Sequence, residues 1–98
     1  MKTFFDSKTE WLNTFLKKHV PDKYQILNKH VLESDFGECV GIDFETNEKA
    51  GYVYFWSSGM VGFGLVDMTN SRPIIDLEFI ELNDSDALPL LSPLIEML

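Results

Sequence analysis

The sequence contains one cysteine and two histidines, and these low counts restrict what the protein can be. Cys39 alone cannot form an intramolecular disulfide, which fits a reducing compartment and predicts a cytoplasmic location. No apolar run is long enough to span a membrane, and Asp6 interrupts the first apolar residues, so we expect neither a membrane segment nor a signal peptide. A chain of 98 residues with 45% hydrophobic content predicts one small folded domain, 1–98.

Positive charge is also scarce. Sixteen acidic residues against eight basic ones give a net charge of −8. Seven lysines minus nine acids leave −2 over residues 1–49, whereas one arginine minus seven acids leaves −6 over residues 50–98. Such a surface repels phosphates, which argues against nucleic acid and anionic membranes as partners. It favours a protein partner with a basic surface, although solubility alone would also explain the charge.

Motifs for cofactors and metals are missing. The glycines between residues 59 and 64 lie between and within predicted strands instead of preceding a helix, so they do not form a nucleotide-binding loop. His19 and His30 are isolated from each other and from any cysteine at metal-binding spacing. We therefore predict no metal and no cofactor.

Two arrangements could support catalysis. His30 could reach Cys39 across a hairpin and act as its base, and Asp76 with Glu78 could perform acid–base chemistry. A structural thiol and solvated carboxylates explain the same residues without catalysis. The sequence therefore predicts a protein that is not an enzyme and has no catalytic residue.

Helical patterns occur at both ends of the chain. Residues 7–19 have apolar side chains at helical spacing, with a capping box formed by Ser7 and Glu10 and a stop at Pro21. Residues 86–98 repeat leucine at helical intervals, preceded by possible caps in residues 83–86. Pro93 does not fit a helix interior, so either this helix kinks or a second short helix starts at Ser92.

Strand-like segments fill the middle of the chain and are joined by short turns. They cover residues 23–33, 38–46, 51–57, 60–68 and 73–82. Short turns favour antiparallel neighbours, hence a meander of four or five strands. We expect an α+β two-layer sandwich with both helices on one face of the sheet and the other face open.

Period-two alternation assigns side chains to the two faces. The side chains expected toward the helices are Val40, Ile42, Phe44, Val53, Phe55, Val61, Phe63, Leu65, Ile75, Leu77 and Phe79. The opposite face should carry the partner-binding residues Asp43, Glu45, Tyr52, Tyr54, Trp56, Asp76 and Glu78. Gly62 and Gly64 on that face should leave room for a partner's backbone. Aromatic residues surrounded by acids are typical of a protein-binding surface.

The C-terminal half, from Tyr52 onward, resembles small bacterial immunity proteins that are encoded beside polymorphic toxins. The similarity involves Trp56-Ser57-Ser58-Gly59, Val66-Asp67 followed by Thr69-Asn70, the acidic strand 76–81 and the Leu-rich end. The TriTu-like group is the family that it resembles. Its members neutralise a type VI secreted ADP-ribosyltransferase toxin that attacks elongation factor Tu. The resemblance implies a cognate protein toxin as the partner and supplies no catalytic motif.

The leading hypothesis is therefore an immunity protein that binds its cognate toxin in the cytoplasm and blocks the active site. One alternative is an adaptor or chaperone-like module that loads a secreted effector and binds a non-catalytic part of it. The other is a small enzyme that uses Cys39 or the strand carboxylates.

Overall fold

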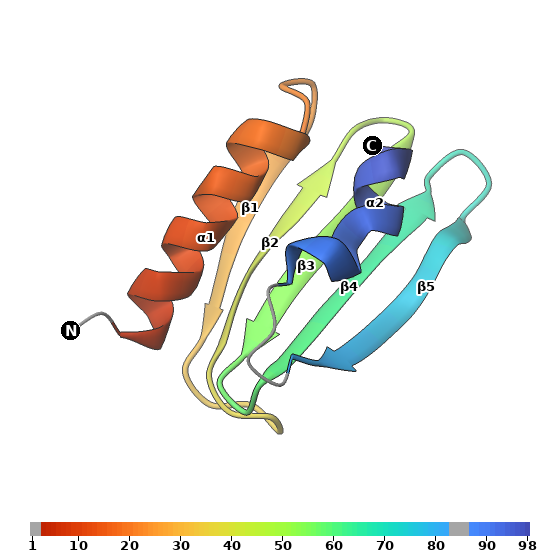
Figure 1. Ribbon diagram of the computed structural model, residues 1–98. Coiled ribbons are helices and arrows are strands. Elements are labelled where there is room, and N and C mark those ends of the chain that lie inside the picture. Colours follow the sequence, from red (N-terminus) through yellow and green to blue (C-terminus); the bar gives the residue numbers. More distant parts are fainter. Residues whose placement is uncertain (1–2, 83–86) are drawn as a thin grey trace.

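The computed structural model describes residues 3–82 and 87–98, apart from the side chain of Leu77. Helix α1 comes first and is followed by five strands, a 3-10 turn η1 and a short helix α2 (Figure 1). Their bounds are α1 Phe4–His19, β1 Gln25–Val31, β2 Cys39–Glu45, β3 Lys49–Trp56, β4 Met60–Asp67, β5 Arg72–Glu81, η1 Leu88–Leu91 and α2 Ser92–Met97. The strands form one antiparallel sheet in the order β1-β2-β3-β4-β5. The predicted α+β meander is confirmed.

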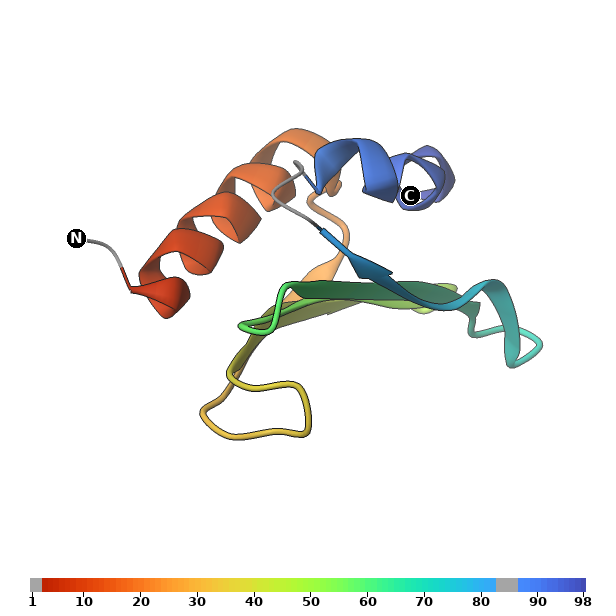
Figure 2. The same ribbon diagram turned by 60° about the horizontal axis from the view of Figure 1, so that its bottom comes forward.

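Both helices cover the same side of the sheet, as predicted. Figure 2 shows α1 and α2 above the strands, while the loop between β1 and β2 curls beneath them. We call the side away from the helices the open face. Within residues 3–82 and 87–98, no helix is long and apolar enough to cross a membrane.

Helix α1 begins earlier than predicted. Thr3 is its N-cap, and the Thr3 side-chain oxygen accepts a hydrogen bond of 3.0 Å from the backbone N–H of Asp6. The predicted capping box at Ser7 is wrong, because Ser7 already lies in the first turn and its N–H donates to the Thr3 carbonyl. A Thr cap one turn upstream offers the same chemistry, and the longer helix also brings Phe4 against the core.

The C-terminal segment breaks at Pro93. Residues Leu88–Leu91 form η1, and α2 starts at Ser92 with proline in its first turn. Of the two alternatives, the second short helix is therefore confirmed. Proline is tolerated at that place because, in the first turn of a helix, it removes no intrahelical hydrogen bond. The possible caps in residues 83–86 lie outside the described part of the chain.

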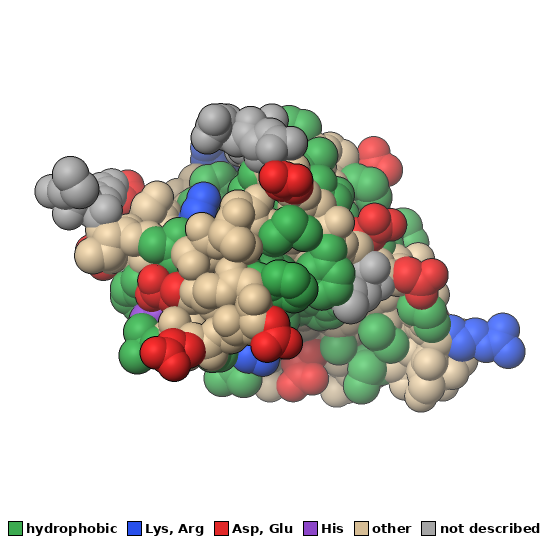
Figure 3. Space-filling model, turned by 90° about the horizontal axis from the view of Figure 1, so that it is seen from below, with side chains coloured by type: hydrophobic (Ala, Val, Ile, Leu, Met, Phe, Trp, Pro, Cys, Tyr) green, Lys and Arg blue, Asp and Glu red, His purple; other side chains and the backbone are tan. Residues whose placement is uncertain are grey.

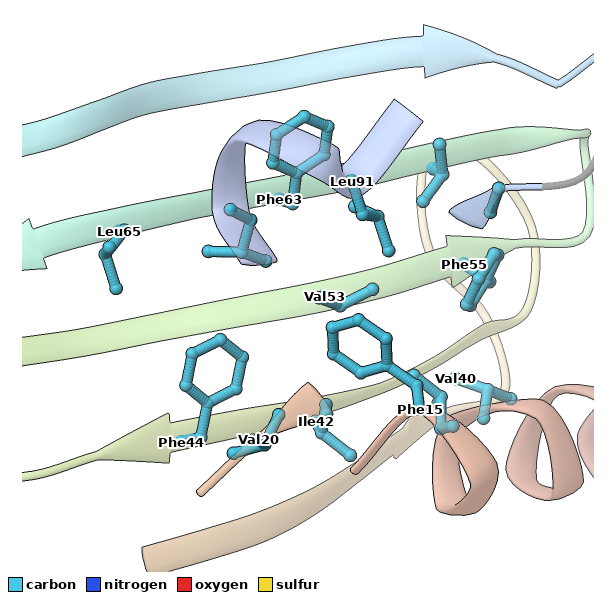
Figure 4. Packing of buried hydrophobic residues seen from close by; sticks show 14 of the residues in the cluster. Phe15, Val20, Val40, Ile42, Phe44, Val53, Phe55, Phe63, Leu65 and Leu91 are labelled. Atoms are coloured by element: carbon cyan, nitrogen blue, oxygen red, sulfur yellow. The ribbon is translucent and has the colours of Figure 1, made fainter. Parts of the chain in front are cut away.

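The hydrophobic core lies between the sheet and the helices (Figure 4). Its strand side chains alternate as predicted along β2, β3 and β4. They are Val40, Ile42, Phe44, Val53, Phe55, Val61, Phe63 and Leu65. Leu12 and Phe15 of α1 and Leu91 and Leu94 of the C-terminal segment pack against them from the other side. Among the described residues, no helix covers the other face of the sheet.

Strand β5 departs from the predicted alternation. Ile75 pairs with Leu65, but Glu78 pairs with Phe63 and Phe79 pairs with Gly62. Two residues of β5 therefore lie opposite Gly64 alone, which is a β-bulge. Because one extra residue reverses the alternation, Phe79 lies on the open face and Glu78 on the helix side, the opposite of the prediction.

The tail should contribute a large share of the stability. Leu94 is 0% exposed and belongs to the core, so Leu94→Ala should lower the free energy of unfolding by about 2–5 kcal/mol. Met97→Ala on the same helix is the control, because Met97 is exposed, and it should change this free energy by less than about 0.5 kcal/mol. Denaturant unfolding measures both. Equal stability of the two variants would mean that α2 does not anchor the core.

Candidate protein-binding face

The open face is centred on β3. Val53 and Phe55 point into the core, so Tyr52, Tyr54 and Trp56 point to the other side of the sheet. Each of the three aromatic side chains is partly exposed. The structure thus places these three predicted residues together, at the centre of the uncovered side.

These side chains belong to a continuous row of rings. The Tyr52 and Tyr54 rings stack with centroids 4.9 Å apart, and Tyr54 meets Trp56 edge-on at 6.0 Å. Phe79 of β5 lies 5.4 Å from Trp56. Phe36 lies 6.0 Å from Trp56 and 6.1 Å from Phe79. We call these five residues the aromatic row. Phe36 and Phe79 are its most exposed members, at 47% and 46%.

Phe36 comes from the loop that curls beneath the sheet, and sequence reasoning missed it. Ser57 holds this loop, because its side-chain oxygen accepts a 2.8 Å hydrogen bond from the Glu38 N–H and its own N–H donates to the Glu38 carbonyl at 2.8 Å. Gly37 turns the loop with a φ of +96°, a conformation that favours glycine. The Trp56-Ser57-Ser58 motif was visible in the sequence, but nothing local to it indicated a bond to residue 38.

The glycines of the open face are already covered. A Cβ atom at Gly41 would lie 2.2 Å from a ring carbon of Tyr54, and one at Gly62 would lie 2.8 Å from the Trp56 ring. At Gly64 the nearest atom would be the Tyr52 hydroxyl oxygen, at 3.0 Å. The expectation that Gly62 and Gly64 leave room for a partner's backbone is therefore wrong. Aromatic rings lie over glycines on neighbouring strands, an arrangement known to support sheets, and a partner would meet the rings.

The acidic residues of this face have different environments. Asp43 accepts a hydrogen bond from the Tyr54 hydroxyl, and the Lys29 amine lies 5.0 Å from the centre of the Tyr54 ring. Glu45 and Asp76 are exposed, and Glu78 lies on the helix side. Figure 3, an end-on view, shows acidic side chains spread among hydrophobic ones. Of the predicted acids on this face, Glu45 and Asp76 are exposed to solvent, while Asp43 is engaged with Tyr54.

Cys39 and His30 lie on opposite sides of the sheet. Cys39 pairs with Trp56 on the open-face side and is buried, and this burial raises the pKa of its thiol. The His30 Nε2 atom lies 2.6 Å from a Glu38 carboxylate oxygen, and its ring contacts Phe5 of α1. The two side chains do not form a nucleophile–base pair. Among the residues that the structure describes, no cluster of His, Cys, Asp or Glu could hold a metal ion.

The short motifs on which the expected resemblance to immunity proteins rests lie mostly in turns. Gly59 has a φ of +101° in the β3–β4 turn. The Asp67 carboxylate accepts hydrogen bonds from the hydroxyl and the N–H of Thr69, at 2.6 and 2.8 Å, and these bonds lower its pKa. Asn70 likewise accepts from the N–H of Arg72 at 3.0 Å. The motif residues therefore fix the lengths and geometry of the connections between strands, and they form no reactive cluster.

No protein-family model matches the chain, and neither a curated protein nor a solved structure matches it. A functional assignment therefore depends on the geometry of the open face, on its charge, and on the resemblance that the C-terminal half carries.

Tyr54 should make stability sensitive to alkaline pH. Burial, followed by the hydrogen bond to Asp43, raises the pKa of its hydroxyl, so the stability that this group contributes is present below the unfolded-state pKa of about 10. That contribution is lost as pH rises from about 10 toward the folded-state pKa. Denaturant unfolding across this range should show a shallower decline for Tyr54→Phe than for wild type. Identical declines would contradict the assigned environment.

Proposed function

We propose that this protein is an immunity protein that binds and neutralises a cognate secreted toxin, and that the open face is its contact surface. The observation that carries the proposal is the aromatic row, which remains partly exposed on the one side of the sheet that lacks helices. The part that concerns binding rests on geometry. The part that concerns the toxin rests on the resemblance of the C-terminal half.

The aromatic row has the properties of an interface core. Tyrosine and tryptophan bury a large area at a small cost in side-chain entropy, and they are enriched among residues that dominate binding energy. Tyr52, Tyr54 and Trp56 are also ordered by one another and by the glycines beneath them. An interface that is already ordered loses less entropy on binding. Phe36 and Phe79, the most exposed members, are the side chains a partner would bury first.

Charge favours a basic partner. The net charge is −8, and Glu45 on β2 and Asp76 on β5 are exposed. Opposite charge accelerates the encounter of two proteins. A toxin whose active-site cleft binds a phosphate-bearing substrate, as the cleft of an ADP-ribosyltransferase does, presents the positive charge that this face complements. The resemblance to the TriTu-like group points to that class of toxin.

Inhibition would follow from occupancy of the cleft. A rigid acidic face with aromatic anchors excludes substrate without any reaction by the immunity protein, so no catalytic group is required. The experiment is to co-express the chain with the toxin encoded beside its gene and to assay the toxin's enzymatic activity with the purified protein. Cell survival and inhibited activity support the proposal. A stable complex in which the toxin remains fully active would indicate the effector-loading adaptor instead.

Side chains of the aromatic row should be binding hot spots. Phe79→Ala and Trp56→Ala should each weaken toxin binding by about 2 kcal/mol, roughly thirtyfold, because they remove ring area at the centre of the contact. Met97→Ala is the control, since Met97 is a similarly exposed apolar residue on α2, on the other side of the sheet. Calorimetric titration gives the affinities. If Met97→Ala weakens binding as much as Phe79→Ala does, the open face is not the interface.

Charge should act on the association rate. Asp76→Lys should slow association about threefold at low salt, and the difference should shrink as salt increases. Glu96→Lys on α2 makes the same change in net charge away from the open face and should have a smaller effect. Stopped-flow mixing at several salt concentrations measures both. Equal rates for the two variants at low salt would show that local charge on this face does not steer the partner.

A further inference from the structure

The two edges of the sheet differ in how they are protected against pairing. On β5, Pro73 lacks an N–H donor, the register is irregular at two places, and the exposed strand residues include acidic side chains. Proline, bulges and edge charges are the features by which proteins block additional strands. On β1, which has seven residues, the register is regular, there is no proline, glycine or acidic residue, and Lys29 is the one lysine. The β5 edge therefore carries more of these protections than the β1 edge does.

The β1 edge is also unusually apolar. Leu27 is 67% exposed and Ile26 is 40% exposed, on alternate sides of the strand. In the described part of the chain no strand lies beyond β1, so the outward backbone groups of this edge have no strand partner. An exposed regular edge with apolar side chains is a template for strand addition.

Helix α1 lies beside the β1 edge and forms one side of a groove along it. A groove of about 270 Å³ lies between the helix and the strand (Figure 1 shows their arrangement). Phe5, Thr9 and Asn13 line it from α1, and Asn28 and His30 line it from β1. A strand added beside β1 would therefore direct every second side chain toward this groove, while its backbone bonds to the edge. Grooves between an edge strand and a helix are suited to extended peptides.

The charge of the β1 edge favours an acidic added strand over a second copy of β1. Between Asp22 and Glu33 the edge carries Lys23 and Lys29 and no acidic residue, although the whole chain has a charge of −8; His30 is already engaged with Glu38. A second copy of β1, paired antiparallel about Asn28, would bring the two Lys29 side chains diagonally close on one face, which is unfavourable for like charges. An acidic strand has no such conflict.

We propose that the β1 edge binds an extended segment of a partner protein, in which acidic and apolar side chains alternate, as an added sixth strand beside α1. The segment's backbone pairs with Gln25–Val31, its acidic side chains meet Lys29, and its apolar side chains enter the groove beside Phe5. Lys29 lies where the β1 edge meets the open face, beside Tyr54. Strand pairing, however, uses the outward backbone of β1 and the groove on the helix side, so the inference goes beyond the proposed function.

The probe is a short blocked peptide in which Glu and Val alternate, tested against the full chain. Fluorescence anisotropy should show binding that weakens about tenfold when Lys replaces Glu in the peptide. Methylation of alternate peptide nitrogens, which prevents strand pairing, should abolish binding. Unchanged binding of the methylated peptide would overturn strand addition, and unchanged binding of the Lys peptide would overturn the assigned chemistry.

A charge variant and a nuclear magnetic resonance map of the contact show where the peptide binds. Lys29→Glu should weaken binding of the Glu peptide at least fivefold, whereas Lys17→Glu, an equal charge change on α1 and outside the groove, should change it less than twofold. Amide shifts in nuclear magnetic resonance should move in β1 and at Thr9 and Asn13. Shifts confined to the aromatic row, with none in β1, would overturn the proposal. So would sedimentation that shows a dimer of the chain disrupted by Leu27→Glu, because the edge would then belong to a second copy.

Discussion

Strand β3 lies at the centre of the sheet and packs nonpolar side chains on both of its faces. Val53 and Phe55 enter the core beneath the helices, while Tyr52, Tyr54 and Trp56 form the aromatic row on the other side. Only the first set is covered by a second layer. The second set is stabilised by ring contacts along the row and by glycines on the neighbouring strands, and it still remains partly exposed. The candidate binding face is therefore a consequence of a central strand in a sheet that has helices on one side only.

Much of the fold could be predicted from the sequence, because alternation along β2, β3 and β4 is regular and short turns leave few topologies. The faces of β5 could not be assigned fully. Its bulge arises from pairing with β4, and a pattern that assumes regular pairing places Phe79 and Glu78 on the wrong sides. The faces of β1 could not be assigned either, since an edge strand is exposed on nearly every residue and selects no hydrophobic side. The start of α1 was missed because Thr3 and Ser7 offer similar caps one turn apart.

The residues of the candidate site were likewise predictable where local sequence places them, and not where contacts between distant segments place them. Tyr52, Tyr54 and Trp56 were predictable, since they follow from the alternation of a single strand. Phe36 was not, because hydrogen bonds between Ser57 and Glu38 bring its loop under the sheet. The glycines were identified, but the sequence shows only that a side chain is missing and not what lies over the gap. Asp43 was expected among the acids around the aromatic residues, whereas its hydrogen bond from the Tyr54 hydroxyl ties it to the aromatic row itself.

The central claim is that the aromatic row is buried by the partner, and Trp56 itself can report it. The chain has two tryptophans, Trp11 on α1 and Trp56, so a Trp11→Phe variant leaves Trp56 as the only tryptophan. The measurement is the quenching of its fluorescence by a neutral solute, without and with a tryptophan-free variant of the toxin encoded beside the gene. Quenching should fall by about half or more when the complex forms, because a buried ring core excludes solvent. Unchanged quenching in a complex that is demonstrably formed would contradict it.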